Sequence, residues 1–440
     1  MTRSPDPEPA LSAGEDPVRY AQILSAVYDA TMAGGKSPAR PREVVGASWR
    51  RLRGLGIDPE QPRPGVAHMD IAELEFRRRE SGLSEILGDL AQGLQSVVRD
   101  GENILVVADH HGRVLWRSGS ASVLDRANAL GFSEGASWAE DAVGTNAIGT
   151  ALVSRRAVQI FSAEHYVRSH HPWTCAGAPI KDPRTGHVVG AVDVSGPART
   201  VHPTTLALVD TVARLAESRL REVHRQHLDR LRSIAAPMLA RLQSPALAVD
   251  SDGWIAAVES VALRDRVLLP DDLAIGRRWL PELGVCDFEP LPGGWLVRPC
   301  GSRPGESASG TGMVTTISIN LRESQHPRVH IRSEVGEWTH EPTPRHTEIL
   351  YLLAVHREGR SAAQLAVDLF GTGGRDITAR AEMSRLRKHF AGIVLAQPYR
   401  FDERAGVELL LPADLENLLP YSTAPAIVRA RRPGWANTRP

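Results

Sequence analysis

The pattern of apolar and polar positions changes along the chain from a helical period to a strand period, which predicts an α+β protein of several domains. Residues Leu83 to Arg99 repeat apolar side chains every three or four positions, as an amphipathic helix does. Two short apolar runs follow, Ile104–Ala108 and Val114–Trp116, on either side of the polar residues 109–112. We expect these two runs to form a β-hairpin.

A second group of strands is expected near residue 185. The runs Ala178–Ile180 and Val188–Val194 flank a stretch of turn-forming residues, so they predict two antiparallel strands. Upstream, Asn146 can cap a short helix over Ala147–Ser154. A sheet, a helix packed on it and an irregular polar loop from Glu164 to Cys175 together predict a small-molecule pocket.

Several ordered motifs lie in and before this region. They are Ser48-Trp49-Arg50-Arg51, Gly56-Ile57-Asp58-Pro59, Trp138, Glu140, the run from Gly144 to Thr150, Glu164-His165, Cys175 to Ile180 and Asp193 to Gly196. In these motifs the chain resembles the GAF sensory domain at the head of acetoin-catabolism-type bacterial transcription activators. The resemblance implies a GAF domain over residues 80–203 that binds a small-molecule effector.

The candidate effector-binding residues are polar or aromatic members of these motifs. They are Trp138, Glu140, Thr145, Asn146, His165, Cys175 and Asp193. Trp138 could form an aromatic wall of the pocket or fill the core, and Asn146 could bind a ligand with its amide or only cap the helix. Gly144 and Gly149 are expected to serve the backbone conformation.

The same stretch contains residue types that bind metals or act as nucleophiles. They are Glu164, His165, His170, His171 and Cys175. Their spacing matches no closed metal site, and the sequence indicates no group that would orient a Cys–His pair for catalysis. We therefore expect a protein that is not an enzyme and has no cofactor, with a metal or haem redox sensor as an alternative.

A long helical pattern without Gly or Pro runs from Thr204 to Arg232. Apolar and small residues recur at alternating spacings of three and four, as in a coiled coil: Leu206, Val209, Ala213, Ala216, Leu220, Val223 and His227. This pattern favours a signalling and dimerisation helix over residues 204–232, and hence a homodimer. The alternative is a single helix that lies back on the sensory sheet.

The segments on either side of the sensor are less specific. Residues 1–79 predict a leader, disordered over residues 1–16, and two helices, Pro17–Met32 and Pro41–Leu55, the second with a basic face that is solvated or intramolecular. Residues 244–300 predict a small PAS-like α+β unit, and residues 301–312 a Gly/Ser linker. The linker lacks the lysine of a nucleotide-binding loop, so the ATPase module of the activators is not expected.

Residues 313–415 predict strands followed by a winged helix. Thr343 and Ser361 can cap two helices, a third covers Ile377–Phe390, and later short runs, including Val407–Leu411, predict the wing. We expect Ile377, Ala381, Met383, Leu386 and Phe390 to face the core. The candidate DNA-binding residues are Thr378, Arg380, Ser384, Arg385, Arg387, Lys388 and Arg400. Residues 416–440 form a basic tail that could contact phosphates or be disordered.

Charge and composition restrict these interpretations only slightly. Lysine plus arginine equals aspartate plus glutamate, 52 each, so a nucleic-acid surface would have to be local. No apolar window is long enough to span a membrane, the N-terminus is unlike a secretory signal, and three cysteines make no disulfide framework. These features favour the cytoplasm.

The sequence thus predicts an α+β multidomain regulator. It comprises a GAF-type antiparallel sheet with helices, a connecting long helix, a small PAS-like unit and a C-terminal winged helix. The predicted function is a transcription regulator that senses a small-molecule effector and binds DNA. The alternatives are a signalling adaptor with a protein-binding winged helix and the metal or haem redox sensor.

Overall fold

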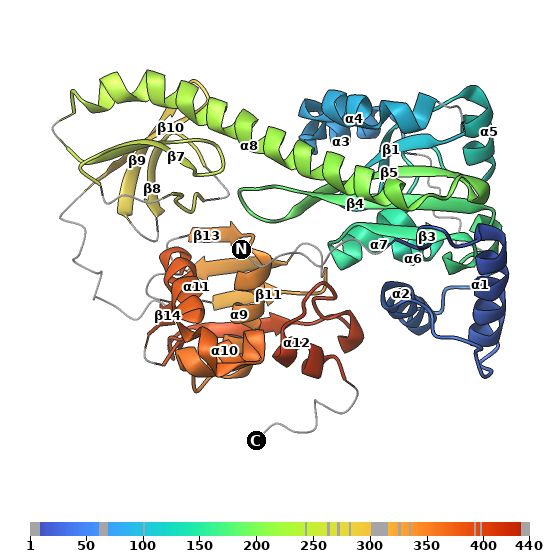
Figure 1. Ribbon diagram of the computed structural model, residues 1–440. Coiled ribbons are helices and arrows are strands. Elements are labelled where there is room, and N and C mark those ends of the chain that lie inside the picture. The colour runs from blue at the N-terminus through green and yellow to red at the C-terminus, as the bar shows by residue number, and fades with distance from the viewer. Residues whose placement is uncertain are drawn as a thin grey trace. The chain divides into compact units, whose positions relative to one another are not determined.

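The computed structural model describes residues 9–60, 69–99, 102–242, 244–261, 265–270, 273–280, 283–300, 316–323, 327–333, 336–390, 393–396 and 398–432. The chain divides into two compact units, residues 1–221 and 222–440 (Figure 1). The expected linker over residues 301–312 lies outside the described residues. Within the described part of the chain, no helix is both long and apolar enough to cross a membrane.

The first unit is built on an antiparallel sheet of five strands in the order β2-β1-β5-β4-β3. The strands are β1 (Ile104–Asp109), β2 (Val114–Ser118), β3 (Val158–Phe161), β4 (Trp173–Lys181) and β5 (Val188–Pro197). The predicted hairpin and the later strand pair are therefore present. Because β4 begins at Trp173, the expected irregular loop ends earlier than the sequence suggested.

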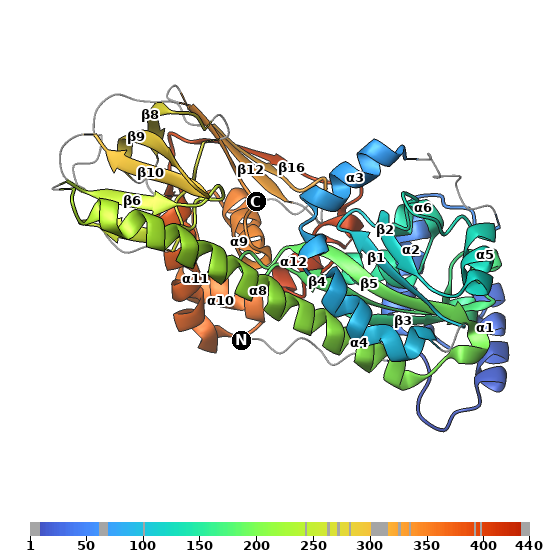
Figure 2. The same cartoon turned by 90° about the horizontal axis from the view of Figure 1, so that it is seen from above.

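Helices cover both faces of this sheet, since alternate strand residues point to opposite sides. One face packs against α1 (Pro17–Met32), α2 (Glu43–Gly54) and α7 (Ala147–Ser154). The other face packs against α3 (Ile71–Glu80), α4 (Leu87–Arg99) and the first part of α8 (Pro203–Leu239), and α4 and α8 lie side by side there (Figure 2). The short helices α5 (Ala121–Ala129) and α6 (Glu140–Val143) complete the unit.

Two expectations for this unit are wrong. Residues 9–16 are not a disordered leader, because Ala10 and Leu11 are each only 4% exposed and the Ala10 amide donates to Gln159 Oε1 at 3.0 Å. The expected coiled-coil seam of α8 is also used differently. Its first four residues, Leu206, Val209, Ala213 and Ala216, are buried against the sheet of their own chain, so this part of the helix lies back on that sheet.

The second unit begins with the last part of α8 and contains two larger sheets. The first has the order β7-β6-β10-β9-β8, and α8 packs on one of its faces through Ala235 and Leu239. Its strands are β6 (Ala246–Val249), β7 (Ile255–Glu259), β8 (Gly276–Leu280), β9 (Gly284–Leu291) and β10 (Gly294–Pro299). The PAS-like character of this unit stays a prediction.

The second sheet of this unit has the order β13-β12-β11-β16 and packs with the last helices around one core. Its strands are β11 (Thr316–Asn320), β12 (Arg328–Ser333), β13 (Gly336–His340) and β16 (Gly406–Leu410). The helices are α9 (Pro344–Val355), α10 (Ala362–Phe370), α11 (Asp376–His389) and α12 (Pro425–Ala430). Thr343 and Ser361 cap α9 and α10 as expected.

Three details of this region differ from expectation. The hairpin consists of β14 (Val394–Leu395) and β15 (Arg400–Phe401), whereas residues 407–410 belong to β16, which pairs in parallel with β11. Met383, Leu386 and Phe390 are buried as expected, but Ile377 is 78% exposed and Ala381 is exposed, while Ala379 is buried instead. Up to Arg432 the tail is folded, since Ile427 and Ala430 join the core.

Candidate functional site

The helix α7 and the corner before it are built by the Gly144–Thr150 motif. Gly144 has a φ of 79°, a conformation that favours glycine, and a Cβ on Gly149 would lie 2.5 Å from the Glu140 amide nitrogen. Asn146 Oδ1 accepts from Gly149 N at 2.9 Å, and its Nδ2 donates to the carbonyls of Trp138 and Gly144. The Asn146 amide therefore binds only backbone groups, as a helix cap does.

Glu140 and Thr145 bind residues of α2 in the structure. The Glu140 carboxylate accepts from Arg51 at 2.7 Å and from Thr150 Oγ1 at 2.7 Å, and Thr145 Oγ1 lies 2.7 Å from Ser48 Oγ. Arg42 makes a similar two-point contact with the buried Glu164. These bonds attach α2 to the rest of the first unit and give its basic face an intramolecular role. They also leave Glu140 with little capacity for a ligand.

A buried polar row crosses the face of the sheet that α7 covers. Cys175 lies opposite Ser195 in the β4–β5 pair, and Asp193 lies opposite Gly177. Ser195 Oγ donates to Asp193 Oδ2 at 2.5 Å, and Cys175 Sγ lies 3.4 Å from His165 Nε2. The structure thus brings together three predicted site residues, His165, Cys175 and Asp193. Ser195, which was not among the predicted site residues, lies between Cys175 and Asp193.

The protonation states in this row follow from burial. Burial lowers the pKa of His165 to about 3 and raises that of the Cys175 thiol well above its usual value. His165 Nδ1 faces the Ser162 carbonyl at 3.0 Å, which can only accept, so Nε2 is left to accept from the thiol. A neutral thiol beside a neutral imidazole lacks the thiolate that nucleophilic catalysis requires.

Trp138 and His170 form the wall next to this row. The Trp138 ring lies 4.0 Å from the Phe132 ring and stacks on His170 at 5.1 Å between centroids, and Trp138 is 5% exposed. Two buried polar atoms in this region, His170 Nδ1 and Asp193 Oδ1, make no hydrogen bond to any of the residues that the structure describes. Burial raises the pKa of Asp193 to about 7 and lowers that of His170 to about 4. Unsatisfied buried groups of this kind suit a bound polar molecule.

The donor types considered for a metal do not assemble into a metal site. His165 and His170 are in edge contact, with ring centroids 6.1 Å apart, and His171 Nε2 lies 3.1 Å from the His165 carbonyl. Over the residues that the structure describes, no group of three or more His, Cys, Asp or Glu side chains is placed to hold a metal ion.

The candidate DNA-binding residues cluster on α11 and the hairpin. Thr378, Arg380, Ser384, Arg385 and Arg387 are exposed. Arg380 pairs with Asp376 at 3.4 Å and Arg385 with Glu382 at 2.7 Å.

The hairpin is fixed to this helix. Arg387 Nε donates to the Val394 carbonyl at 3.1 Å, which ties α11 to β14. Arg400 pairs with Glu403 at 2.5 Å. The Lys388 side chain lies outside the described residues.

Comparison with known proteins gives the context of this geometry. Residues 29–220 match the family model described as "MimR, N-terminal domain". An uncharacterized 47.3 kDa protein in the thcA 5′ region of Rhodococcus erythropolis is 31% identical over 347 residues, which cover 76% of this chain and 59% of that protein. The region matched by the family model lies entirely within the first unit.

Two similar proteins are named as transcriptional activators. AcoR of Bacillus subtilis, the acetoin dehydrogenase operon activator, is 39% identical over 29% of this chain and 21% of its own length. MimR of Mycolicibacterium smegmatis, the propane 2-monooxygenase operon activator, is 30% identical over 36% of this chain and 28% of its own length. The chain thus spans under two thirds of the length of each relative, and it is similar to transcription regulators through its N-terminal region.

Proposed function

We propose that this chain is a transcription regulator in which the first unit senses a small molecule and the winged helix of the second unit binds DNA. The similarity of residues 29–220 to the N-terminal regions of named activators carries the proposal. The geometry of α11 supports it, because an exposed helix with Thr378, Arg380 and Ser384 on its surface is suited to a major groove.

The effector site proposed here lies between Trp138, His170 and the Asp193 row. It is supported by His170 Nδ1 and Asp193 Oδ1, which have no hydrogen-bond partner within the described part of the chain and which a small polar molecule would satisfy. The other candidate effector-binding residues divide into two groups. His165 and Cys175 belong to this row, whereas Glu140, Thr145 and Asn146 hold the corner that shapes it.

DNA binding is tested by gel shift of the full chain with fragments of the source genome at several salt concentrations. We expect retention of a few fragments and an affinity that falls linearly on a logarithmic salt scale. Failure of the wild-type chain to bind any fragment at low salt would contradict the DNA-binding role.

Effector binding is tested by a thermal-shift screen of small metabolites on the full chain. A molecule that binds the native state raises the melting temperature. The variant His170→Phe keeps a ring against Trp138 but removes both ring nitrogens, so it should abolish the shift of a true effector. The exposed His202 provides the matched control, since His202→Phe should leave the shift unchanged.

One observation favours a second candidate, an adaptor whose winged helix binds protein. Ile377 is 78% exposed at the start of α11, and two of the candidate arginines there are already paired with acidic residues. Exposed apolar side chains of this size favour protein contacts over phosphate contacts. The gel shift above separates the two candidates.

A further inference from the structure

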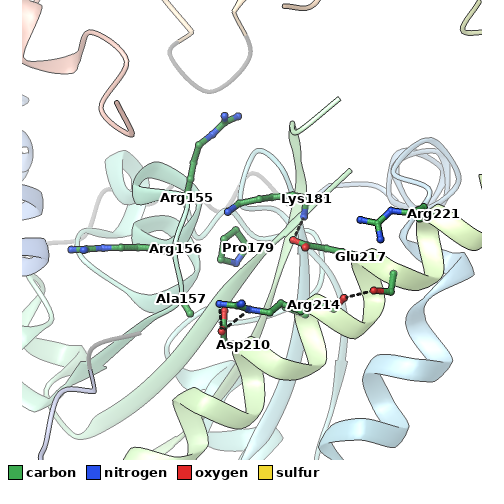
Figure 3. A pocket seen from close by; sticks show the side chains of 11 residues that line it. Arg155, Arg156, Ala157, Pro179, Lys181, Asp210, Arg214, Glu217 and Arg221 are labelled. Carbon is green, nitrogen blue, oxygen red and sulfur yellow. Dashed lines mark hydrogen bonds and ion pairs between the residues drawn. The ribbon is translucent and has the colours of Figure 1, made fainter. Parts of the chain in front are cut away.

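A polar cavity of about 270 Å³ lies at the edge of the sensory sheet, away from the buried Asp193 row. Three segments line it: residues 155–157 before β3, Pro179 and Lys181 at the end of β4, and one face of α8 from Asp210 to Arg221 (Figure 3). Arg156 and Arg221 mark opposite ends of the view, and the Lys181 side chain runs toward the base of Arg155.

The lining of the cavity is mainly basic. Its five basic side chains are Arg155, Arg156, Lys181, Arg214 and Arg221, against the two acidic side chains Asp210 and Glu217. This composition gives a formal excess of three positive charges.

Both acidic groups are already engaged within the unit. Asp210 pairs with Arg214 at 2.9 Å, and Glu217 Oε1 accepts from the Lys181 backbone amide at 2.9 Å. Among the residues that the structure describes, no hydrogen bond or ion pair is made by the Lys181 ammonium or by the guanidinium groups of Arg156 and Arg221.

The half-buried position of Lys181 makes an uncompensated charge unfavourable there. Burial lowers the pKa of Lys181, and the charges of Arg155 and Arg214 lower it further, whereas Glu217 and Asp210 raise it. A negatively charged group next to the Lys181 ammonium would offset the desolvation cost of this charge and would accept its hydrogen bonds.

We propose that this cavity is a binding site for a small molecule that carries a carboxylate or phosphate group. Its volume is that of a small metabolite, and its basic donors come from three separate segments that converge on one concave space. A small anionic molecule that fills the cavity would interact with Lys181 on the sheet and with Arg221 on α8, so it would strengthen the packing of the helix on the sheet. This proposal can be tested separately from the proposed function, because binding of a small anion to the cavity is measured without DNA.

The test is calorimetric titration of the full chain with inorganic phosphate and, separately, with succinate, at ionic strength matched with chloride. We expect at least one of the two probes to bind with one site per chain and to raise the melting temperature. Binding of phosphate alone, or of succinate alone, identifies the group that the cavity recognises. Absence of binding by both probes at millimolar concentration would overturn the proposal.

Variants locate the binding. Lys181→Met and Arg221→Gln should each lower the affinity for the probe by about tenfold, as the loss of one charge-assisted hydrogen bond predicts. Arg219→Gln is the matched control, because Arg219 lies on the same helix but faces Asp89 and does not line the cavity. Arg221 is exposed, so its variant keeps the test valid if Lys181→Met does not fold. Equal affinity of the wild type and both variants would overturn the location.

Discussion

Asp193 and His165 lie in the same buried row, yet their titrations affect stability in opposite directions. Burial raises the pKa of Asp193 from 3.8 to about 7, so between these values the native state holds a proton that the unfolded state releases. This contribution to the free energy of unfolding is present at low pH and is lost as the pH rises through 7. For His165 and His170 the pKa falls from 6.5 to about 3 and about 4, so their contribution is lost as the pH falls below 6.5.

Asp193→Asn isolates the first effect, since asparagine cannot ionise. We expect the variant to gain stability relative to the wild type as the pH rises from about 4 to 7, by up to about 4 kcal/mol for a shift of three pKa units. Urea unfolding of both proteins across this range measures the difference. A difference that does not change with pH would show that Asp193 ionises normally in the folded chain.

The sequence allowed the role of some site residues to be predicted but not others. Asn146 precedes a helical run, and a side-chain cap is a local property that the sequence displays. Asp193 was identified only through the resemblance, and its relation to Cys175 and Ser195 depends on the pairing of β4 with β5. Such pairings join distant segments, so no local period indicates which polar groups meet on the sheet.

At the scale of elements, α2 is attached to the rest of the first unit by buried ion pairs as well as by apolar packing. Arg51→Ala would leave the Glu140 carboxylate, which is 6% exposed, with Thr150 alone. Removing one partner of a buried pair costs about 3–5 kcal/mol, so we expect a clear fall in the melting temperature. The neighbouring Arg50 is exposed, and Arg50→Ala is the control that should change stability little. Equal stability of both variants would contradict the attachment.

The α11 helix carries a prediction about DNA. Arg380 and Arg385 are both exposed and both paired with acidic residues on their own helix, but they lie on different sides of it. We expect Arg380→Ala to weaken the free energy of binding to the cognate DNA site by about 1–3 kcal/mol. The variant should also show a weaker preference for that DNA sequence, as loss of a base contact would cause. Arg385→Ala should weaken all DNA about equally and reduce the salt slope by about one. Equal losses on every sequence for both variants would remove the base-reading role of Arg380.

The elements themselves divide in the same way into predictable and unpredictable parts. The bounds of α1, α7 and α10 follow from Pro17, Asn146 and Ser361, because caps and first-turn prolines act within a few residues. The parallel pairing of β16 with β11 could not be predicted from the sequence, because it joins segments about 90 residues apart. In α11 the sequence predicted the buried Met383, Leu386 and Phe390, but it did not show that Ala379 rather than Ile377 faces the core at the start of the helix.

At the scale of the whole molecule, α8 links the two units, since residues 203–221 belong to the first and residues 222–239 to the second. The inner face of its first part is buried against the sensory sheet, so it is not available to a second chain. A dimer through this part of α8 would have to use its outer face, where Leu215 is 58% exposed. Exposed leucines of this kind are expected at a helix–helix interface.

The burial of these α8 residues decides which substitution tests for a dimer. Leu220→Lys would also disturb the sensory core, against which Leu220 packs, whereas Leu215→Lys adds a charge to an already exposed position. We expect light scattering to give a dimer for the wild type at micromolar concentration and a monomer for Leu215→Lys with an unchanged melting temperature. Leu220→Lys should instead lower the melting temperature by weakening the core, whatever its mass. A wild-type chain that is already monomeric at that concentration would exclude α8 as a dimerisation helix.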